Sequence, residues 1–402
     1  MKILLTEGSG LTSRQVATQL GLSGHHVEIL SSTPICLTRF TRHVRRVHPV
    51  PEFGRAPLDW LKAAEEIVRQ RDIDLLFPTQ EQVAVLSARR DALTCATVVP
   101  AFEALSRVQD KISAFRTLEA IGVPQPPTTI IHGPEDLSKV DGFPVFLKRP
   151  VSTASSGVRK VNSPDELRAA AITLDVSDQE MLVQQPCLGP LAMVQAVADN
   201  GRLVAHHANV RVQEGVGGGA AVKQSVAIPS MQEALGKLIA RLNWHGAISL
   251  DVILTENGPL VIDVNPRIVE PMNAYLSGVD LVGSMLSLAA RQPVAPQPPG
   301  RPGVRTHQLL LAILGAAQMQ ASRSAVLGEL YHALRKTGRY AGSIEELTPT
   351  RGDPISAIPV AAAACATLLR PGAWRSFYGS AVGSYALTPQ GWAQIVSLAT
   401  ED

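Results

Sequence analysis

The feature that most constrains the fold is a pair of acidic residues set inside two apolar runs of one hairpin. Ala247–Arg267 reads AISLDVILTENGPLVIDVNPR, which predicts two strands, Ile248–Leu254 and Leu260–Val264, joined by a short turn. One run contains Asp251 and the other contains Asp263. A buried carboxylate is costly unless it is paired or bound to a metal. The hairpin must therefore lie where both acids have a partner.

The spacing around the turn places Asp251 opposite Asp263, and Asn265 points to the same face as Asp263 because side chains alternate along a strand. Three oxygen ligands then converge, with Arg267 directly behind them. This set suits Mg²⁺, which a few carboxylates bind together with phosphate oxygens and water. Simple pairing with arginines would explain one buried aspartate, but not two facing ones. We therefore predict Asp251, Asp263 and Asn265 as the ligands of a metal–phosphate site.

The rest of the chain reads as a mixture of α/β and α+β structure. The first third alternates apolar strand runs with helical spacing, which predicts a parallel sheet covered by helices. Ligands bind such sheets at the carboxyl ends of the strands, here near Thr6–Gly10 and Thr79–Glu81. Residues 143–264 are rich in closely spaced strands, which favours an antiparallel sheet. The expected N-terminal strands are Lys2–Thr6, His26–Leu30, Asp74–Pro78 and Val98–Pro100.

Composition excludes several classes of protein. With 402 residues, the chain should hold two or three domains, and its 18% of charged residues argues against disorder. A formal net charge of +2 and 4% aromatic residues argue against a nucleic-acid partner. The four cysteines form no CxxC pair and read as free thiols. We find no signal peptide and no stretch long enough to span a membrane, so we expect a cytoplasmic protein. The longest apolar run, Ala357–Leu369, reads as a buried helix.

Beyond the hairpin, several motifs follow one another in an order that resembles the ATP-grasp superfamily. The run DVNPR, with an acid about twelve residues earlier, is similar to the metal-binding signature of that family. The resemblance covers roughly residues 1–290 and indicates a carboxylate–amine ligase. The matching segments before the hairpin are Asp110-Lys111, FPVFLK at 143–148, STASSG at 152–157 and LVQQPCLG at 182–189.

The resemblance implies that the protein binds ATP with Mg²⁺, or with Mn²⁺ as an alternative. Lys111 and Lys148 would neutralise the triphosphate, and the small residues of the STASSG loop would let backbone N–H groups approach it. Arg267 would stabilise the transferring phosphoryl group. The implied nucleotide-binding residues are Lys111, Lys148, Ser155, Ser156 and Gly157 of the lid, and Gln184, Gln185, Pro186, Cys187 and Leu188 of the hinge that holds adenine.

The chain departs from the family pattern in three places. The lid loop has one glycine where many members have several, and the hinge glutamate is replaced by Gln185. The acid that often meets the ribose hydroxyls is missing beyond Gly189. How the ribose is held is therefore open.

The usual reaction of the family is phosphorylation of a carboxylate by ATP, followed by attack of an amine on the acyl phosphate. The expected partners are thus a small carboxylate and an amine, and a homodimer is left open. Arg211 and Lys223 are candidate catalytic cations beside the Gly-rich loop 215–219, although that loop could equally be a plain hairpin turn. Gln80 and Glu81 follow a strand end, where they could select the second substrate or cap a helix.

Three other functions are weaker alternatives. An ATP sensor without ligation conflicts with the intact metal set, and a biotin carboxylase-like enzyme lacks a defensible bicarbonate signature. A nicotinamide-dependent oxidoreductase would rest on Gly8-Ser9-Gly10 alone. The expected parts are a pre-ATP-grasp α/β domain (1–104), a lid (105–188), an antiparallel core with the metal site (189–292), a Pro-rich linker (293–302) and a helical C-terminal domain (303–402).

Overall fold

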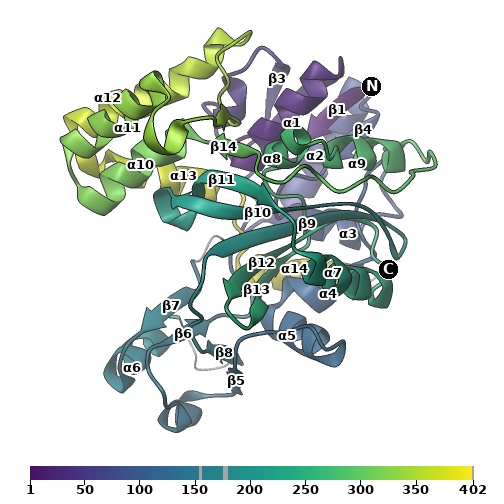
Figure 1. Cartoon of the computed structure of the whole chain (residues 1–402). Coiled ribbons are helices and arrows are strands. Elements are labelled where there is room, and N and C mark those ends of the chain that lie inside the picture. Colours follow the sequence, from purple (N-terminus) through teal and green to yellow (C-terminus); the bar gives the residue numbers. More distant parts are fainter. Residues whose placement is uncertain (154–155, 175–179, 401–402) are drawn as a thin grey trace.

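The computed structural model, which describes residues 1–153, 156–174 and 180–400, contains three β-sheets in a mixed α/β and α+β arrangement (Figure 1). A four-stranded parallel sheet forms the N-terminal body, and a seven-stranded sheet forms the middle. A second four-stranded sheet forms the projecting lid at the bottom of the view. Their strand orders are β3-β2-β1-β4, β13-β12-β9-β10-β11-β14-β15 and β5-β8-β6-β7. This is the fold class that the sequence predicted.

The N-terminal sheet has β1 (Lys2–Leu5) between β2 (His26–Ser31) and β4 (Leu75–Phe77), all parallel. The expected strand at Val98–Pro100 is wrong: these residues form no strand, and the chain beside β4 makes an isolated bridge between Ala96 and Leu75. The opposite edge of the sheet is β3 (Val44–Pro49), which was not expected. The covering helices are α1 (Leu11–Leu22), α2 (Pro57–Arg71) and α3 (Val83–Ala88).

The central sheet confirms the predicted hairpin. β12 (Gly246–Thr255) pairs antiparallel with β13 (Gly258–Asn265), and the register sets Asp251 directly opposite Asp263. The neighbouring strands are β9 (Leu191–Asp199), β10 (Arg202–Glu214) and β11 (Ala220–Val226).

Helices cover both faces of the central sheet, and their apolar side chains form two separate cores. On one face, α8 and α9 join the central sheet to the N-terminal sheet. On the other face, α4, α5 and α7 pack against β9, β12 and β13. The helices are α4 (Phe102–Gln109), α5 (Lys111–Ala120), α7 (Pro229–Arg241), α8 (Met272–Ser277) and α9 (Leu281–Ala289).

The lid is a small antiparallel sheet backed by one helix, and it has its own apolar core. Its strands and helix are β5 (Thr128–Ile131), β6 (Val145–Lys148), β7 (Val158–Val161), α6 (Pro164–Thr173) and β8 (Met181–Gln184).

The last hundred residues are mainly helical, as expected, but they are built into the rest of the molecule. β14 (Arg305–His307) pairs with β11, and β15 (Ile344–Glu345) pairs with β14, so this region extends the central sheet. The Pro-rich run before β14 holds no helix or strand and is bonded to the body through Gln297 and Arg301. The helices are α10 (Leu309–Gln320), α11 (Arg323–Arg335), α12 (Ala357–Leu369), α13 (Trp374–Gly383) and α14 (Pro389–Thr400).

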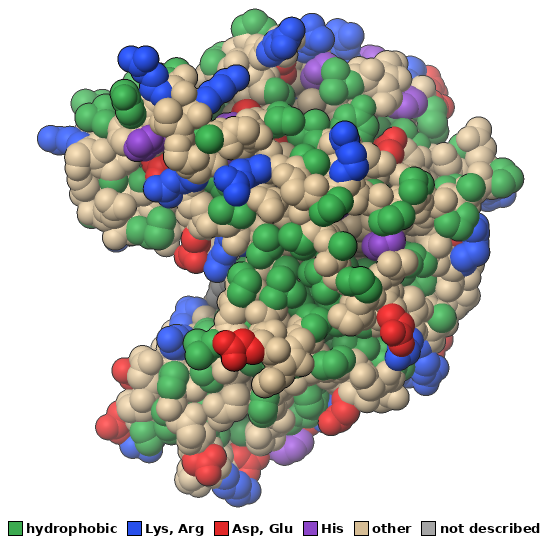
Figure 2. Space-filling view, in the orientation of Figure 1, with side chains coloured by type: hydrophobic (Ala, Val, Ile, Leu, Met, Phe, Trp, Pro, Cys, Tyr) green, Lys and Arg blue, Asp and Glu red, His purple; other side chains and the backbone are tan. Residues whose placement is uncertain are grey.

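The body is hollowed on one side, between the C-terminal helices α10–α13 and the lid strands β6 and β7 (Figure 2). Helix α12 is the apolar run singled out in the sequence, and only one of its faces is buried. Among the described residues, no helix is both long and apolar enough to cross a membrane. The domain boundaries set out above stay predictions.

Candidate active site

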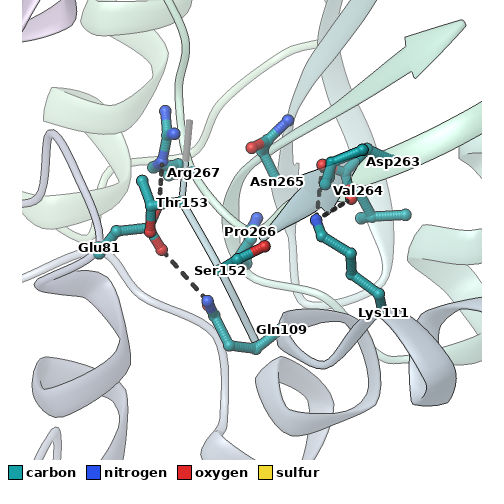
Figure 3. Close-up of a pocket in the computed structure, with 11 residues that line it drawn as sticks. Glu81, Gln109, Lys111, Ser152, Thr153, Asp263, Val264, Asn265, Pro266 and Arg267 are labelled. Atoms are coloured by element: carbon teal, nitrogen blue, oxygen red, sulfur yellow. Dashed lines mark hydrogen bonds and ion pairs between the residues drawn. The ribbon is translucent and has the colours of Figure 1, made fainter. Parts of the chain in front are cut away.

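A pocket lies where the lid, the central hairpin and the N-terminal sheet meet (Figure 3). Its walls come from the end of β13, the start of α5, the loop after β4 and the loop after β6. Most of its side chains are polar or charged. The lining residues are Glu81, Gln109, Lys111, Ser152, Thr153, Val158, Asp263, Val264, Asn265, Pro266 and Arg267.

The three residues predicted as metal ligands lie together at this hairpin. Asn265 Nδ2 is 3.4 Å from Asp251 Oδ2, and Asp263 is the register partner of Asp251. Burial and the facing Asp263 carboxylate raise the pKa of Asp251 to about 6. Two carboxylates that repel one another, with an amide oxygen beside them, form a donor set that suits Mg²⁺. Within the described ranges, no cluster of three His, Cys, Asp or Glu side chains could hold a metal, so any ion here would need the amide, phosphate or water as well.

Lys111 is placed by the start of helix α5. The Asp110 side chain accepts hydrogen bonds from the N–H groups of Ile112 and Ser113, at 2.8 and 3.0 Å, and so caps the helix. Lys111 therefore falls in the first helical turn, and its Nζ donates to both Asp263 oxygens at 2.7 and 2.8 Å. The ammonium group thus neutralises one of the two facing carboxylates (Figure 3).

Lys148 reaches the same hairpin from β6. Its Nζ donates to Gln184 Oε1 at 2.7 Å and to the Ile262 carbonyl at 3.0 Å. Burial lowers the pKa of Lys148 to about 8, although the nearby Asp263 carboxylate counteracts this shift. Gln184, predicted as part of the adenine hinge, is itself buried, and its Nε2 donates to Thr128 Oγ1. Its side chain therefore fixes Lys148 rather than facing open space.

The other hinge residues lie along the exposed edge of the lid. Leu188 is 91% exposed, and Pro186 is exposed as well. Gln185 and Cys187 are half-buried, and the Gln185 backbone N–H donates to the Pro127 carbonyl. The structure thus leaves an apolar side chain uncovered where the sequence predicts adenine.

The lid loop is partly described. Gly157 is buried close to Ser152, because a Cβ at position 157 would lie 2.5 Å from that side chain. Ser156 is exposed, and its N–H donates to the Thr153 carbonyl at 3.1 Å. Ser155, also predicted to bind phosphate, lies outside the described residues.

Arg267 points into the pocket from the end of the hairpin and is paired with an acid of the N-terminal sheet. Its Nε donates to Glu81 Oε1 at 3.2 Å, and the other Glu81 oxygen accepts from Gln109 Nε2 at 3.2 Å (Figure 3). Glu81 is thus part of the site and makes no cap to α3. Sequence analysis missed Gln109, whose position directly before Asp110-Lys111 was the available signal.

The two further candidate cations, Arg211 and Lys223, do not line the pocket, and neither is unpaired. Lys223 is 1% exposed and bridges Glu270, at 2.5 Å, and Glu346, at 2.7 Å. Arg211 donates to the Gly218 carbonyl at 2.6 Å and pairs with Glu214 at 3.1 Å. Both cations are thus already paired with acids, and the catalytic role expected from the sequence stays a prediction for each.

Comparison with known proteins yields one family match. Residues 108–271 match the family described as the ATP-grasp domain. A D-alanine–D-alanine ligase of Streptococcus equi subsp. equi is 34% identical over 90 residues, which is 21% of this chain and 26% of that enzyme. The matched stretch thus spans about a quarter of that relative. A probable alpha-L-glutamate ligase of Thioalkalivibrio sulfidiphilus is 23% identical over 307 residues, covering 71% of this chain and 93% of that protein.

Solved structures share the fold. A biotin carboxylase of Campylobacter jejuni superposes with a TM-score of 0.63 at 18% identity, covering 76% of this chain and 74% of that one. At this identity the likeness concerns the fold alone.

Proposed function

We propose that the protein is an ATP-dependent ligase, because its residues 108–271 match the ATP-grasp domain family. In this proposal it activates a small carboxylate, such as an amino acid, as an acyl phosphate and joins it to an amine. The γ-phosphoryl group passes from ATP to a carboxylate oxygen, and ADP leaves. The amine then attacks the carbonyl carbon and loses a proton, and phosphate departs with one of the original carboxylate oxygens.

The observation that carries the proposal is the pair of facing aspartates with cations gathered around them. Asp251 and Asp263 share one register position, and Lys111 and Lys148 reach the hairpin from two different elements of the chain. Opposite charges brought together from distant segments are what a polyphosphate with a divalent cation requires.

Each residue then has a stated task. Asp251, Asp263 and Asn265 would hold Mg²⁺, which would neutralise phosphate oxygens when bound. Lys111 would leave Asp263 and turn to the phosphates, because the divalent ion would take over the charge of that carboxylate. Lys148 would stay beside the hairpin through Gln184. Arg267 would stabilise the transferring phosphoryl group, with Glu81 orienting its guanidinium.

The relatives support the type of reaction but leave its substrates open. Two of them are named as ligases, one of D-alanine and one of glutamate. A carboxylase is the second candidate, because a pyruvate carboxylase of Bacillus subtilis is 24% identical to this chain over 263 residues, which is 59% of this chain and 23% of that enzyme. The two candidates differ in the acid that they activate.

An oxygen-isotope experiment tests the proposal. The protein is incubated with Mg-ATP, a pool of amines and ¹⁸O-labelled acids, namely acetate, bicarbonate and the common amino acids, including D-alanine. We expect ADP, and phosphate that carries one ¹⁸O from the activated acid. Transfer from bicarbonate alone would favour the carboxylase. Release of AMP and pyrophosphate, or of phosphate without label, would rule out an acyl phosphate.

A further inference from the structure

The lobe formed by helices α10, α11 and α12 exposes positive charge but no negative charge. Between residues 309 and 370, every acidic side chain is buried or half-buried and has a hydrogen-bond or ion-pair partner, namely Glu329, Glu345, Glu346 and Asp353. The exposed charged residues of the same stretch are all basic: Arg323, Arg335, Lys336, Arg339, Arg351 and Arg370. The net charge of the whole chain is only +2, so this lobe is a local concentration of cations.

Most of these cations are not neutralised inside the molecule. Among the described residues, Arg339 alone of the six forms an ion pair, with Glu329 at 3.5 Å. The Arg335 guanidinium lies over the Tyr331 ring, 5.9 Å from its centroid, and Arg323 donates to the Leu369 carbonyl at 3.2 Å. Neither contact cancels a charge. The positive charge of the lobe is therefore available to an anionic partner.

Large apolar side chains stand between the cations of α11. Leu327, Tyr331 and Leu334 are 54%, 57% and 83% exposed. They are four and three residues apart, so they share one side of the helix, and the opposite side packs in a core with α10 and α12. Arg323 lies one turn before Leu327, and Arg335 follows Leu334 directly. We call these five residues the α11 stripe.

Helix α12 adjoins the stripe with a second apolar surface. Its exposed residues are all uncharged, and they include Ile358 and Leu369, which are 49% and 79% exposed. Leu369 meets α11 through the hydrogen bond that its carbonyl accepts from Arg323. Both helices lie at the rim of the molecule away from the lid, and basic and apolar side chains stand side by side over this lobe at the upper left of Figure 2. Exposed apolar groups gathered in this way indicate an interaction surface.

We propose that this lobe binds the surface of a membrane that contains anionic lipids. The two leucines and the tyrosine of the α11 stripe enter the boundary between headgroups and acyl chains, and the basic residues contact the lipid phosphates. A helix that combines leucines with arginines and has no exposed acid is typical of this mode of binding. A membrane fits better than an acidic protein, because both helices lie at a projecting rim that a flat surface can reach. The inference is independent of the proposed ligase function.

Vesicle sedimentation tests the apolar part of the proposal. The full-length protein is mixed with vesicles of phosphatidylcholine alone, or with about one third phosphatidylglycerol, and the bound fraction is measured. We expect at least tenfold stronger binding to the anionic vesicles. L334E should lower this binding at least tenfold, because a leucine is lost from the boundary and a negative charge is added. The matched control is I172E, since Ile172 on the lid helix α6 is also 83% exposed, and it should bind as wild type does.

A pair of double variants tests the charges. R323Q/R335Q should bind the anionic vesicles at least tenfold more weakly, because each basic residue near an anionic surface contributes roughly a fivefold factor. The control K62Q/K237Q removes two exposed charges elsewhere and lowers the net charge equally, so it should bind as wild type does. High salt should weaken wild-type binding as well.

Several results would overturn the inference. They are equal binding of wild type to anionic and neutral vesicles, unchanged binding of L334E, or equal binding of R323Q/R335Q and its control. Fluorescently labelled poly-L-glutamate provides the second probe, and its binding is measured by anisotropy. If wild type binds this acidic polypeptide but not the anionic vesicles, the partner is an acidic protein and the membrane proposal fails. None of these measurements depends on turnover of ATP.

Discussion

Asp263 and Asp251 face each other across the hairpin, yet their surroundings differ. Asp263 accepts two hydrogen bonds from Lys111, whereas Asp251 Oδ2 has the Asn265 amide nitrogen beside it at 3.4 Å. Burial and the facing Asp263 carboxylate raise the pKa of Asp251, and Lys111 pairs with Asp263. The pair therefore combines a carboxylate in an ion pair with one that makes no ion pair to any described residue.

Replacing Asp263 by asparagine should reduce ADP release on the order of a hundredfold or more, because one metal ligand and the partner of Lys111 are lost together. Steady-state ADP formation measures the effect, with circular dichroism to verify folding. The control is E256Q, an exposed acid in the turn of the same hairpin. Activity within twofold of wild type in D263N would mean that the metal site lies elsewhere.

Binding of Mg²⁺ should weaken as the pH falls below about 6. The raised pKa of Asp251 means that this carboxyl is protonated below pH 6, so a cation must displace the proton. Affinity should be constant well above pH 6 and fall about tenfold for each pH unit below it. Calorimetric titration with Mg²⁺ between pH 5 and 8 measures this dependence. The D251N variant should bind weakly at every pH; a wild-type affinity that stays flat down to pH 5 would contradict the assignment.

Among the helices and strands, the junction between α4 and α5 is the most informative feature. Asp110 adopts an extended backbone and caps α5, so that α4 and α5 are two separate helices. The break turns the first residue of the new helix, Lys111, toward the hairpin. Strand β3 was missed for another reason, since its exposed Arg45 and Arg46 hide the alternation of an edge strand.

Removal of the Asp110 cap should weaken ATP binding more than it lowers the stability of the fold. D110A is expected to cost about 1 kcal/mol of stability, the usual value of a helix N-cap. It should also weaken ATP binding severalfold, because Lys111 loses its fixed place. The matched control is S163A, whose side chain caps α6 on the outside of the lid. Equal ATP affinity in both variants would show that the cap has no role in the site.

For the whole molecule, the decisive feature is that the C-terminal helix packs against the N-terminal domain. Helix α14 packs against α2 and α3, and its side chains share a core with β1 and β4. The C-terminal region therefore completes the N-terminal body, which sequence analysis treated as separate. The C-terminal region is joined to the central sheet as well, because it supplies strands β14 and β15 at one edge of that sheet.

The packing of α14 against the N-terminal domain can be tested with I395A. Deleting a fully buried isoleucine side chain typically costs about 2–5 kcal/mol. We expect faster hydrogen exchange in α2 and α3 and a lower melting temperature, while the lid helix α6 keeps its protection. V396A, its neighbour with a 36% exposed side chain, is the control and should leave α2 and α3 unchanged. An effect confined to α14 would mean that the last helix is an independent attachment.

The sequence by itself determined the hairpin, its facing acids and the order of the segments that resemble the ATP-grasp family. These features depend on the alternation of side chains along a strand and on short sequence spacings, and both involve residues that are close together in the chain. Only the tertiary structure decided that Lys111 pairs with Asp263, that Glu81 pairs with Arg267, and that Lys223 is enclosed by two glutamates. Such pairings join positions more than a hundred residues apart or depend on which faces pack together, and local patterns carry no information about either.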